Sequence, residues 1–179
     1  MAVQQERRKR VVPPLDGEGL ERLAIGYAGR YAVTRAKLKA YLARKLRERG
    51  WAGDGEPPVD GLVERCARLG YVDDAAFATA RAESLSRRGY GARRVETALK
   101  VAGVEEADGS AAREYAEAEA WNAALRFAER RRIGPYADAW PERPEREKKL
   151  AAMLRAGHPL GLARKIVAAR PGEFPEADD

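Results

Sequence analysis

Residues 69–104 read LGYVDDAAFATARAESLSRRGYGARRVETALKVAGV, and this stretch decides the fold. Its apolar residues recur at three- and four-residue steps, which is the spacing of one face of an α-helix. Asp73 is placed to cap the first helix, and Gly89-Tyr90-Gly91 forms a turn before a second helix that ends at Gly103. The stretch therefore predicts two helices joined by a short basic turn.

The same arrangement recurs on both sides of this stretch. Pairs of large apolar residues followed by a helix-ending glycine appear three times, the last time with one residue fewer: Leu42, Leu46, Gly50; Val95, Leu99, Gly103; and Leu150, Leu154, Gly157. Each of these helices is expected to be the middle one of three. The sequence therefore predicts an all-α protein of three tandem three-helix repeats, stacked into an elongated body, straight or curved, because units this small cannot close a full core alone.

A basic segment and an acidic segment flank the predicted repeats. A flexible basic arm is predicted at the start, where Arg7-Arg8-Lys9-Arg10 precedes Pro13-Pro14, and an acidic tail is predicted at the end. The predicted parts are the arm at 1–15, repeats at 16–70, 71–110 and 111–170, and the tail at 171–179. The third helix of the second repeat is expected to be weak and could extend past residue 110. A single helix is expected from Ser110 to the arginines at 130–132.

Local signals place the other helix ends and the core. Thr34 and Asp60 are predicted N-caps, because their side-chain oxygens can accept hydrogen bonds from free backbone N–H groups. The tyrosines of the first repeat, Tyr27, Tyr31 and Tyr41, share helix faces with apolar residues and are assigned to the core side. Cys66 is interpreted as a small buried residue and His158 as a helix-end residue.

Several classes of protein are excluded by what the sequence lacks. No apolar run approaches the ~20 residues that span a bilayer, and the first ten residues lack the apolar segment of a signal peptide, so we expect a cytoplasmic protein. There is one cysteine, one histidine and no nucleotide-binding or hydrolase motif. We therefore expect no enzymatic activity, no cofactor and no metal site, and we interpret Asp73-Asp74 as a helix cap rather than a metal pair.

Charge is concentrated in the first part of the chain. Residues 1–50 contain 13 Lys and Arg against 5 Asp and Glu, whereas residues 51–109 carry a net charge of −3. A basic surface of this kind can attract nucleic acid or an acidic protein, or it can be a solvated helix face. Two clusters of cations are the candidate partner- or DNA-binding residues: Arg35, Lys37, Lys39, Arg44 and Lys45, and Arg87, Arg88, Arg93 and Arg94.

Three motifs resemble the RecX family of recombination regulators. They are the segment 70–78, the Arg-Arg-Gly-Tyr-Gly-Ala-Arg-Arg-Val turn and helix that runs to Val104, and Thr34-Arg35-x-x-Leu38. The resemblance covers about residues 16–170. It implies three repeats of three helices that bind the RecA recombinase and its nucleoprotein filament. It also implies that the protein restrains filament growth, ATP hydrolysis and strand exchange without catalysing a reaction.

Two functions of different class follow from these observations. The first is a monomeric regulator that binds the RecA filament and reaches single- or double-stranded DNA through its basic face, with no membrane partner. The second is a DNA-binding regulator of the helix-turn-helix kind, because helix pairs joined by short turns also fit that geometry. Against the second, the basic helices lack the mixture of amide and hydroxyl side chains that reads base edges, and the single asparagine, Asn122, lies outside them. A generic helical scaffold is the third interpretation.

Overall fold

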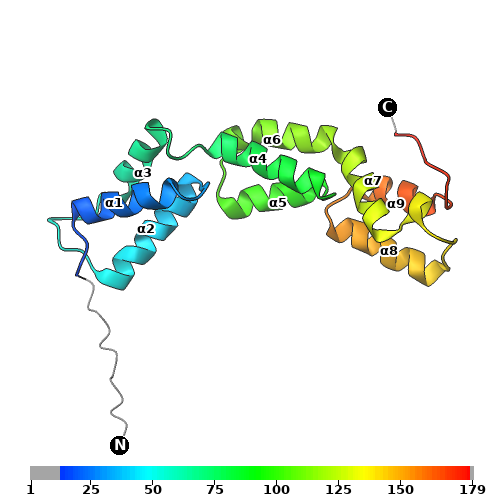
Figure 1. Cartoon of the computed structure of the whole chain (residues 1–179), viewed down its shortest axis with the longest axis horizontal. Coiled ribbons are helices and arrows are strands. Elements are labelled where there is room, and N and C mark those ends of the chain that lie inside the picture. Colours follow the sequence, from blue (N-terminus) through cyan, green and yellow to red (C-terminus); the bar gives the residue numbers. More distant parts are fainter. Residues whose placement is uncertain (1–12, 178–179) are drawn as a thin grey trace, which may run out of the picture. The chain divides into compact units, whose positions relative to one another are not determined.

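The computed structural model describes residues 13–177, and this part of the chain is almost entirely helical. Nine α-helices and one 3-10 turn follow one another, and the described residues contain a single isolated bridge between Leu15 and Trp51. The predicted all-α class is confirmed. The chain forms two compact units, the first ending at Val72 and the second beginning at Asp73 (Figure 1). The arginines of the predicted arm and the last two residues of the tail lie outside the described range.

The first unit contains α1 (Gly17–Ala28), α2 (Arg35–Arg49) and α3 (Val59–Arg68), which pack against one another (Figure 1). Thr34 caps α2 as predicted, because its hydroxyl accepts a hydrogen bond of 3.2 Å from the backbone N–H of Lys37. The core is made of side chains at the helical spacing seen in the sequence, together with a cysteine that is buried as expected: Leu20, Ala24, Leu38, Leu42, Leu62, Val63 and Cys66.

Two features of this unit differ from the predictions. Leu15 was assigned to the arm, but it is buried, and its backbone bonds to both Gly50 and Ala52. The preceding Pro13 and Pro14 stop a helix but do not prevent this extended pairing. Asp60 is also not an N-cap. Pro58 occupies that position, and Asp60 lies in the first turn of α3, where its negative charge suits the helix dipole.

The second unit begins with α4 (Asp74–Arg87), α5 (Ala92–Ala102) and α6 (Glu106–Ala118). Asp73 caps α4 as predicted, since its carboxylate accepts a hydrogen bond of 2.8 Å from the N–H of Ala76. Helices α4 and α6 lie along each other (Figure 1), and their buried contact residues are mainly small: Ala78, Ala82, Ala112 and Ala116. Alanine at these positions lets the two helix backbones approach closely.

The single helix predicted from Ser110 to residue 132 is wrong, because two helices occupy this range. Helix α6 ends at Ala118, and α7 (Ala120–Arg131) begins after Glu119. Alanine and glutamate favour helix on both sides of the break, so propensity alone does not mark it. The chain changes direction at this break. Helix α6 therefore contributes to the core with α4, while α7 contributes Phe127 to the next core. The third helix of this set therefore extends well past residue 110.

The last three helices share a third core within the second unit. Helix α7 is followed by the 3-10 turn Gly134–Tyr136, α8 (Arg143–Arg155) and α9 (Leu160–Ala168). Their buried residues include Phe127, Ile133, Met153, Ile166 and Val167. As predicted, the helices that end before Gly50, Gly103 and Gly157 are the middle ones of three, and all three glycines have positive φ.

Two turns meet inside the second unit and join its two sets of helices. The Gly91 N–H donates to the Ala156 carbonyl at 3.0 Å, and the Arg93 N–H donates to the Gly157 carbonyl at 3.3 Å. A Cβ atom at Gly91 would collide with the Gly157 carbonyl, so this approach requires glycine. The Gly89-Tyr90-Gly91 turn is therefore a structural joint as well as a link between helices.

His158 completes this joint. It follows α8, as predicted, but it is fully buried, and its Nε2–H donates to the Gly89 carbonyl at 3.1 Å. Its Nδ1 has no hydrogen-bond partner among the described residues, and its ring packs against Phe127 with centroids 5.5 Å apart. Burial lowers the pKa of His158, although the hydrogen bond to Gly89 opposes the shift. The buried site therefore favours the neutral form of the His158 ring.

The single histidine makes the joint testable by pH. Because the folded state disfavours protonated His158, the unfolded chain binds more protons below its ordinary pKa of about 6.5. The free energy of unfolding is therefore expected to fall between pH 7 and 5.5, by at most about 1.4 kcal/mol per pH unit. His158→Gln keeps an N–H donor without titrating, so its stability is expected to change less over this range in urea titrations. An equal slope in both proteins would contradict this account.

A matched pair of glycines tests the contact between the Gly89 turn and helix α7. Gly89 and Gly70 both have a φ of 75° after a helix, but a Cβ at Gly89 would lie 2.8 Å from the Phe127 nitrogen, whereas one at Gly70 meets nothing within 4 Å. Gly70→Ala is expected to cost about 1–2 kcal/mol of unfolding free energy from backbone strain. Gly89→Ala should cost roughly a further 1–3 kcal/mol from overpacking. Denaturation followed by circular dichroism measures both, and equal losses would argue against the contact.

Candidate functional site

The first predicted cluster of cations is divided between two sides of α2. Arg35 and Lys39 lie on the side next to α3, where Arg35 Nε is 3.8 Å from Glu64 and Lys39 Nζ is 2.6 Å from Asp60. Lys37 is exposed one turn from Thr34. Exposed ion pairs of this kind are screened and contribute little to stability, but they reduce the charge that a partner encounters. The acids of α3 therefore compensate part of this cluster.

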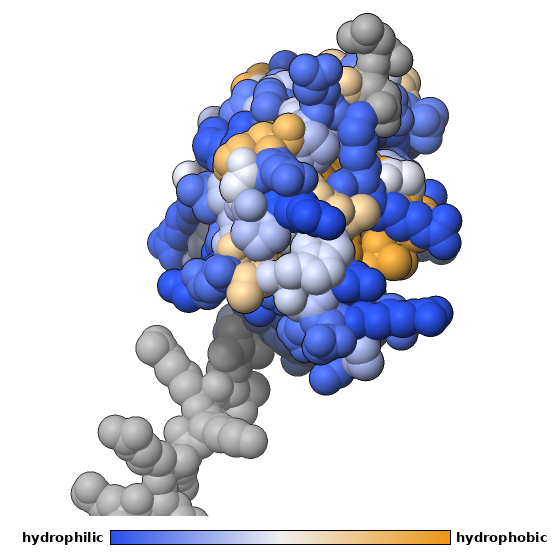
Figure 2. Space-filling view, turned by 90° about the vertical axis from the view of Figure 1, so that its right-hand side faces the viewer, coloured by the Kyte–Doolittle hydropathy of each residue, from blue (hydrophilic) through white to orange (hydrophobic). Residues whose placement is uncertain are grey.

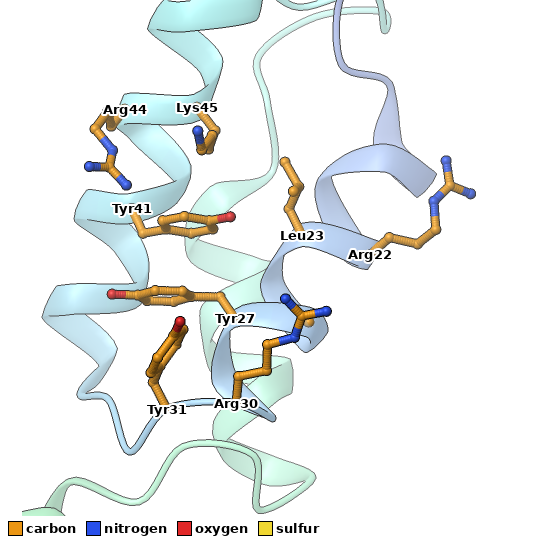
Figure 3. A pocket seen from close by; sticks show the side chains of 9 residues that line it. Arg22, Leu23, Tyr27, Arg30, Tyr31, Tyr41, Arg44 and Lys45 are labelled. Atoms are coloured by element: carbon orange, nitrogen blue, oxygen red, sulfur yellow. The ribbon is translucent and has the colours of Figure 1, made fainter. Parts of the chain in front are cut away.

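Arg44 and Lys45 lie on the other side of α2, next to α1. Their cationic groups are 5.6 Å and 5.9 Å from the centroid of the Tyr41 ring. Tyr41 stacks on Tyr27 at a centroid distance of 3.9 Å and an interplanar angle of 6°, and Tyr31 lies beyond Tyr27 at 5.5 Å (Figure 3). Two cations and three tyrosines thus form one row across α1, α2 and the segment that joins them.

A pocket of about 490 Å³ opens beside this row, and we call it the tyrosine pocket. Its wall consists of four cations, three tyrosines and two further residues, with no acid among them: Arg22, Arg30, Arg44, Lys45, Tyr27, Tyr31, Tyr41, Leu23 and Gly26 (Figure 3). Glu48, which does not line the pocket, pairs with both Arg44 and Lys45, and the hydrogen bond from Lys45 lowers the pKa of its carboxyl group. The pocket is therefore basic and aromatic.

The residues predicted from the sequence include only part of this pocket. Arg44 and Lys45 are among them, Arg22 and Arg30 are not, and the tyrosines were expected on the core side. Tyr27 and Tyr41 are half-buried, whereas Tyr31 is 58% exposed. Spacing gives part of the signal, because Arg44 and Lys45 follow Tyr41, and Arg30 follows Tyr27, by three or four residues. Arg22 has no such spacing to a tyrosine of the pocket.

Two of the four arginines in the second predicted cluster lie near the ring of Tyr90. The guanidinium carbons of Arg88 and Arg94 are 5.4 Å and 5.9 Å from the Tyr90 ring centroid. Arg130, from α7, donates a hydrogen bond to the Arg88 carbonyl and so belongs to the same group of side chains. We call Arg88, Tyr90, Arg94 and Arg130 the Tyr90 patch. Because the turn that contains Tyr90 is held against the turn after α8, these side chains project from a rigid base.

The other two arginines of this cluster lie apart from the patch. Arg87 pairs with Glu83 one turn earlier on α4, at 3.6 Å. Arg93 borders a pocket in which Arg113 pairs with both Glu96 and Glu106. The structure therefore brings together Arg88 and Arg94, and it places Arg87 and Arg93 among acids.

Charged side chains dominate the surface chemistry of the described residues. Among residues 13–177, no group of three His, Cys, Asp or Glu side chains could hold a metal ion, and burial raises the pKa of Cys66, which keeps it a thiol. No helix in this range has the length and apolar character needed to cross a membrane. The face shown in Figure 2 is mostly hydrophilic, with small, separate hydrophobic areas. Surfaces of this composition suit contacts with charged partners.

Comparison with known proteins shows what the chain resembles. The family model described as "RecX, second three-helix domain" matches residues 73–112. A regulatory protein RecX from Myxococcus xanthus is 32% identical over 160 residues, which are 85% of this chain and 86% of that protein. Another from Agrobacterium fabrum is 29% identical over 140 residues, or 76% of this chain and 74% of that protein.

Comparison with solved structures agrees with these sequence matches. The crystal structure of RecX from Lactobacillus salivarius matches with a TM-score of 0.61 at 16% identity, and the match covers 84% of this chain and 93% of that one. At this identity the structural match shows the fold, while the Myxococcus relative shows the family. The resemblance found in the sequence motifs is confirmed, and the chain belongs to the RecX family of regulatory proteins.

Proposed function

We propose that this chain binds the RecA recombinase and its nucleoprotein filament and inhibits filament growth, ATP hydrolysis and strand exchange without catalysing a reaction. The observation that carries the proposal is membership of the RecX family, supported by an identity of 32% that extends over most of both proteins. Such a regulator acts by binding alone, so it needs interaction surfaces and no catalytic groups.

Two surfaces on the chain suit this role. A recombinase filament on DNA presents phosphates and protein carboxylates, and Arg side chains bind both through two parallel hydrogen bonds. The tyrosine pocket and the Tyr90 patch each combine cations with aromatic rings. We propose that Arg44 and Lys45 in the first, and Arg88 and Arg94 in the second, make the main contacts with the filament.

The remaining candidate residues have a smaller part in the proposal. Arg35, Lys39 and Arg87 each have a carboxylate of their own within ion-pair distance, whereas Arg44 and Lys45 share that of Glu48, so a partner gains less from each of the first three. Lys37 and Arg93 are exposed and could add long-range attraction, which accelerates association more than it strengthens the complex. We therefore propose that these five residues steer the filament to the surface rather than hold it there.

The proposal predicts inhibition at amounts of protein comparable to RecA. RecA-catalysed ATP hydrolysis on single-stranded DNA is expected to decline as the chain is added, because each bound molecule occupies contacts that the filament needs. A coupled ATPase assay, with filament length followed by light scattering, measures this directly. If hydrolysis is unchanged and no RecA binding is detected, the proposal is wrong. If the chain instead binds one duplex sequence tightly, the helix-turn-helix alternative is favoured.

The Tyr90 patch can be tested by removing two charges. Arg88→Ala with Arg94→Ala is expected to raise the concentration needed for half-inhibition at least about a hundredfold, since each hydrogen bond from a charged group contributes ~1.5–3 kcal/mol. The matched control is Arg81→Ala with Arg155→Ala, which removes two exposed arginines of the same unit outside the patch. Both double variants should retain the helical circular dichroism of the parent. Equal inhibition by the two variants would contradict a role for the patch.

A further inference from the structure

We propose that the tyrosine pocket binds one nucleotide unit of a single-stranded nucleic acid, with a phosphate among its cations and a base against Tyr31. The inference goes beyond the proposed function, because it concerns direct binding of nucleic acid by this chain with no recombinase present. It rests on three properties of the pocket: the charge of its wall, the order of its aromatic rings and its size.

The wall of the pocket carries unbalanced positive charge. Arg22 pairs with the exposed Glu18 at 3.3 Å, and Arg44 and Lys45 share one carboxylate, that of Glu48. Within residues 13–177, no ion pair is formed by Arg30, which extends into the pocket (Figure 3). Four cations therefore meet two carboxylates, both outside the wall. A phosphate that enters replaces screened ion pairs with charge-assisted hydrogen bonds.

The aromatic rings form a platform with one open end. Arg44 and Lys45 lie over Tyr41, Tyr41 covers Tyr27, and Tyr31 follows at the end of the row (Figure 3). The Tyr27 and Tyr41 rings are half-buried and pack against the first core, so the row is held in place before a ligand arrives. Tyr31 is 58% exposed and presents ring surface to which a flat group can add.

Size and geometry favour a single strand over other anions. A volume of about 490 Å³ falls in the range that accepts one small ligand. In a duplex the bases are stacked in pairs, so a phosphate could reach the cations but no base could reach Tyr31. An acidic peptide would likewise use the cations and leave the tyrosine unused. Proteins that bind single strands combine a basic groove with aromatic side chains in this way.

The test uses the full chain and a fluorescent dT oligonucleotide of about 15 nucleotides, within the site sizes usual for such proteins. Fluorescence anisotropy at low salt is expected to show binding, with Tyr31→Ala weakening it about tenfold, the loss typical of one base stacked on one ring. Tyr31→Phe should retain most of the affinity. The matched control is Tyr71→Ala, since Tyr71 is 44% exposed in the same unit but does not line the pocket.

An abasic oligonucleotide separates the base from the phosphates. It keeps the charge but has no base to stack, so it should bind the parent about as weakly as the dT oligonucleotide binds Tyr31→Ala, and Tyr31→Ala should not weaken it further. Arg30→Ala should weaken both oligonucleotides, whereas Arg68→Ala, at an exposed arginine of α3, should weaken neither. Circular dichroism checks that every variant keeps its helical content.

Several results would overturn the inference. These are undetectable binding of the dT oligonucleotide, equal affinity for the abasic one, no effect of Tyr31→Ala, or the same loss on Tyr31→Ala when a duplex or polyglutamate is the ligand. The last would identify a general anion surface or a protein-binding surface. Because no RecA is present, failure here leaves the proposed regulation of RecA untouched, and failure of the ATPase test leaves this site untouched.

Discussion

The second unit depends on the close approach of two turns, one between α4 and α5 and the other after α8. Backbone hydrogen bonds from Gly91 and Arg93 hold them together, and the approach is possible only because Gly91 has no Cβ. Buried His158 fills the remaining space and bonds to Gly89. The contact places the two sets of helices and also fixes the base from which Arg88, Tyr90 and Arg94 project. A structural joint and a candidate interaction surface therefore share the same short segment.

The number of cations says less about binding than their distribution. Helix α2 has positive residues all round, but its α3 side faces Asp60 and Glu64 while its α1 side faces tyrosines. The second side combines excess charge with aromatic rings. The same pairing recurs around Tyr90, where two guanidinium groups lie near one ring. Aromatic rings beside cations are favoured energetically, and they also keep long side chains extended at the surface.

Local signals predicted those features that depend on neighbours in the sequence. Thr34 and Asp73 cap helices as expected, because a cap involves residues only three positions apart. The predictions were wrong where contacts between residues far apart in the chain determine the local structure. The break at Glu119 follows from two separate cores that α6 and α7 each help to build, and Leu15 is buried because its backbone pairs with Gly50 and Ala52. The tyrosines were assigned to the core since an amphipathic pattern does not distinguish a buried ring from one that lines a pocket.

The helical class, the order of three helices in each set, the caps at Thr34 and Asp73 and the family follow from the sequence, because each depends on short-range spacing and on motifs of adjacent residues. Tertiary structure alone decided which cations are neutralised by α3, which tyrosines stack, and that the lone histidine is buried between two turns. Those properties depend on distances between residues far apart in the chain, such as His158 and Gly89. Only packing sets such distances.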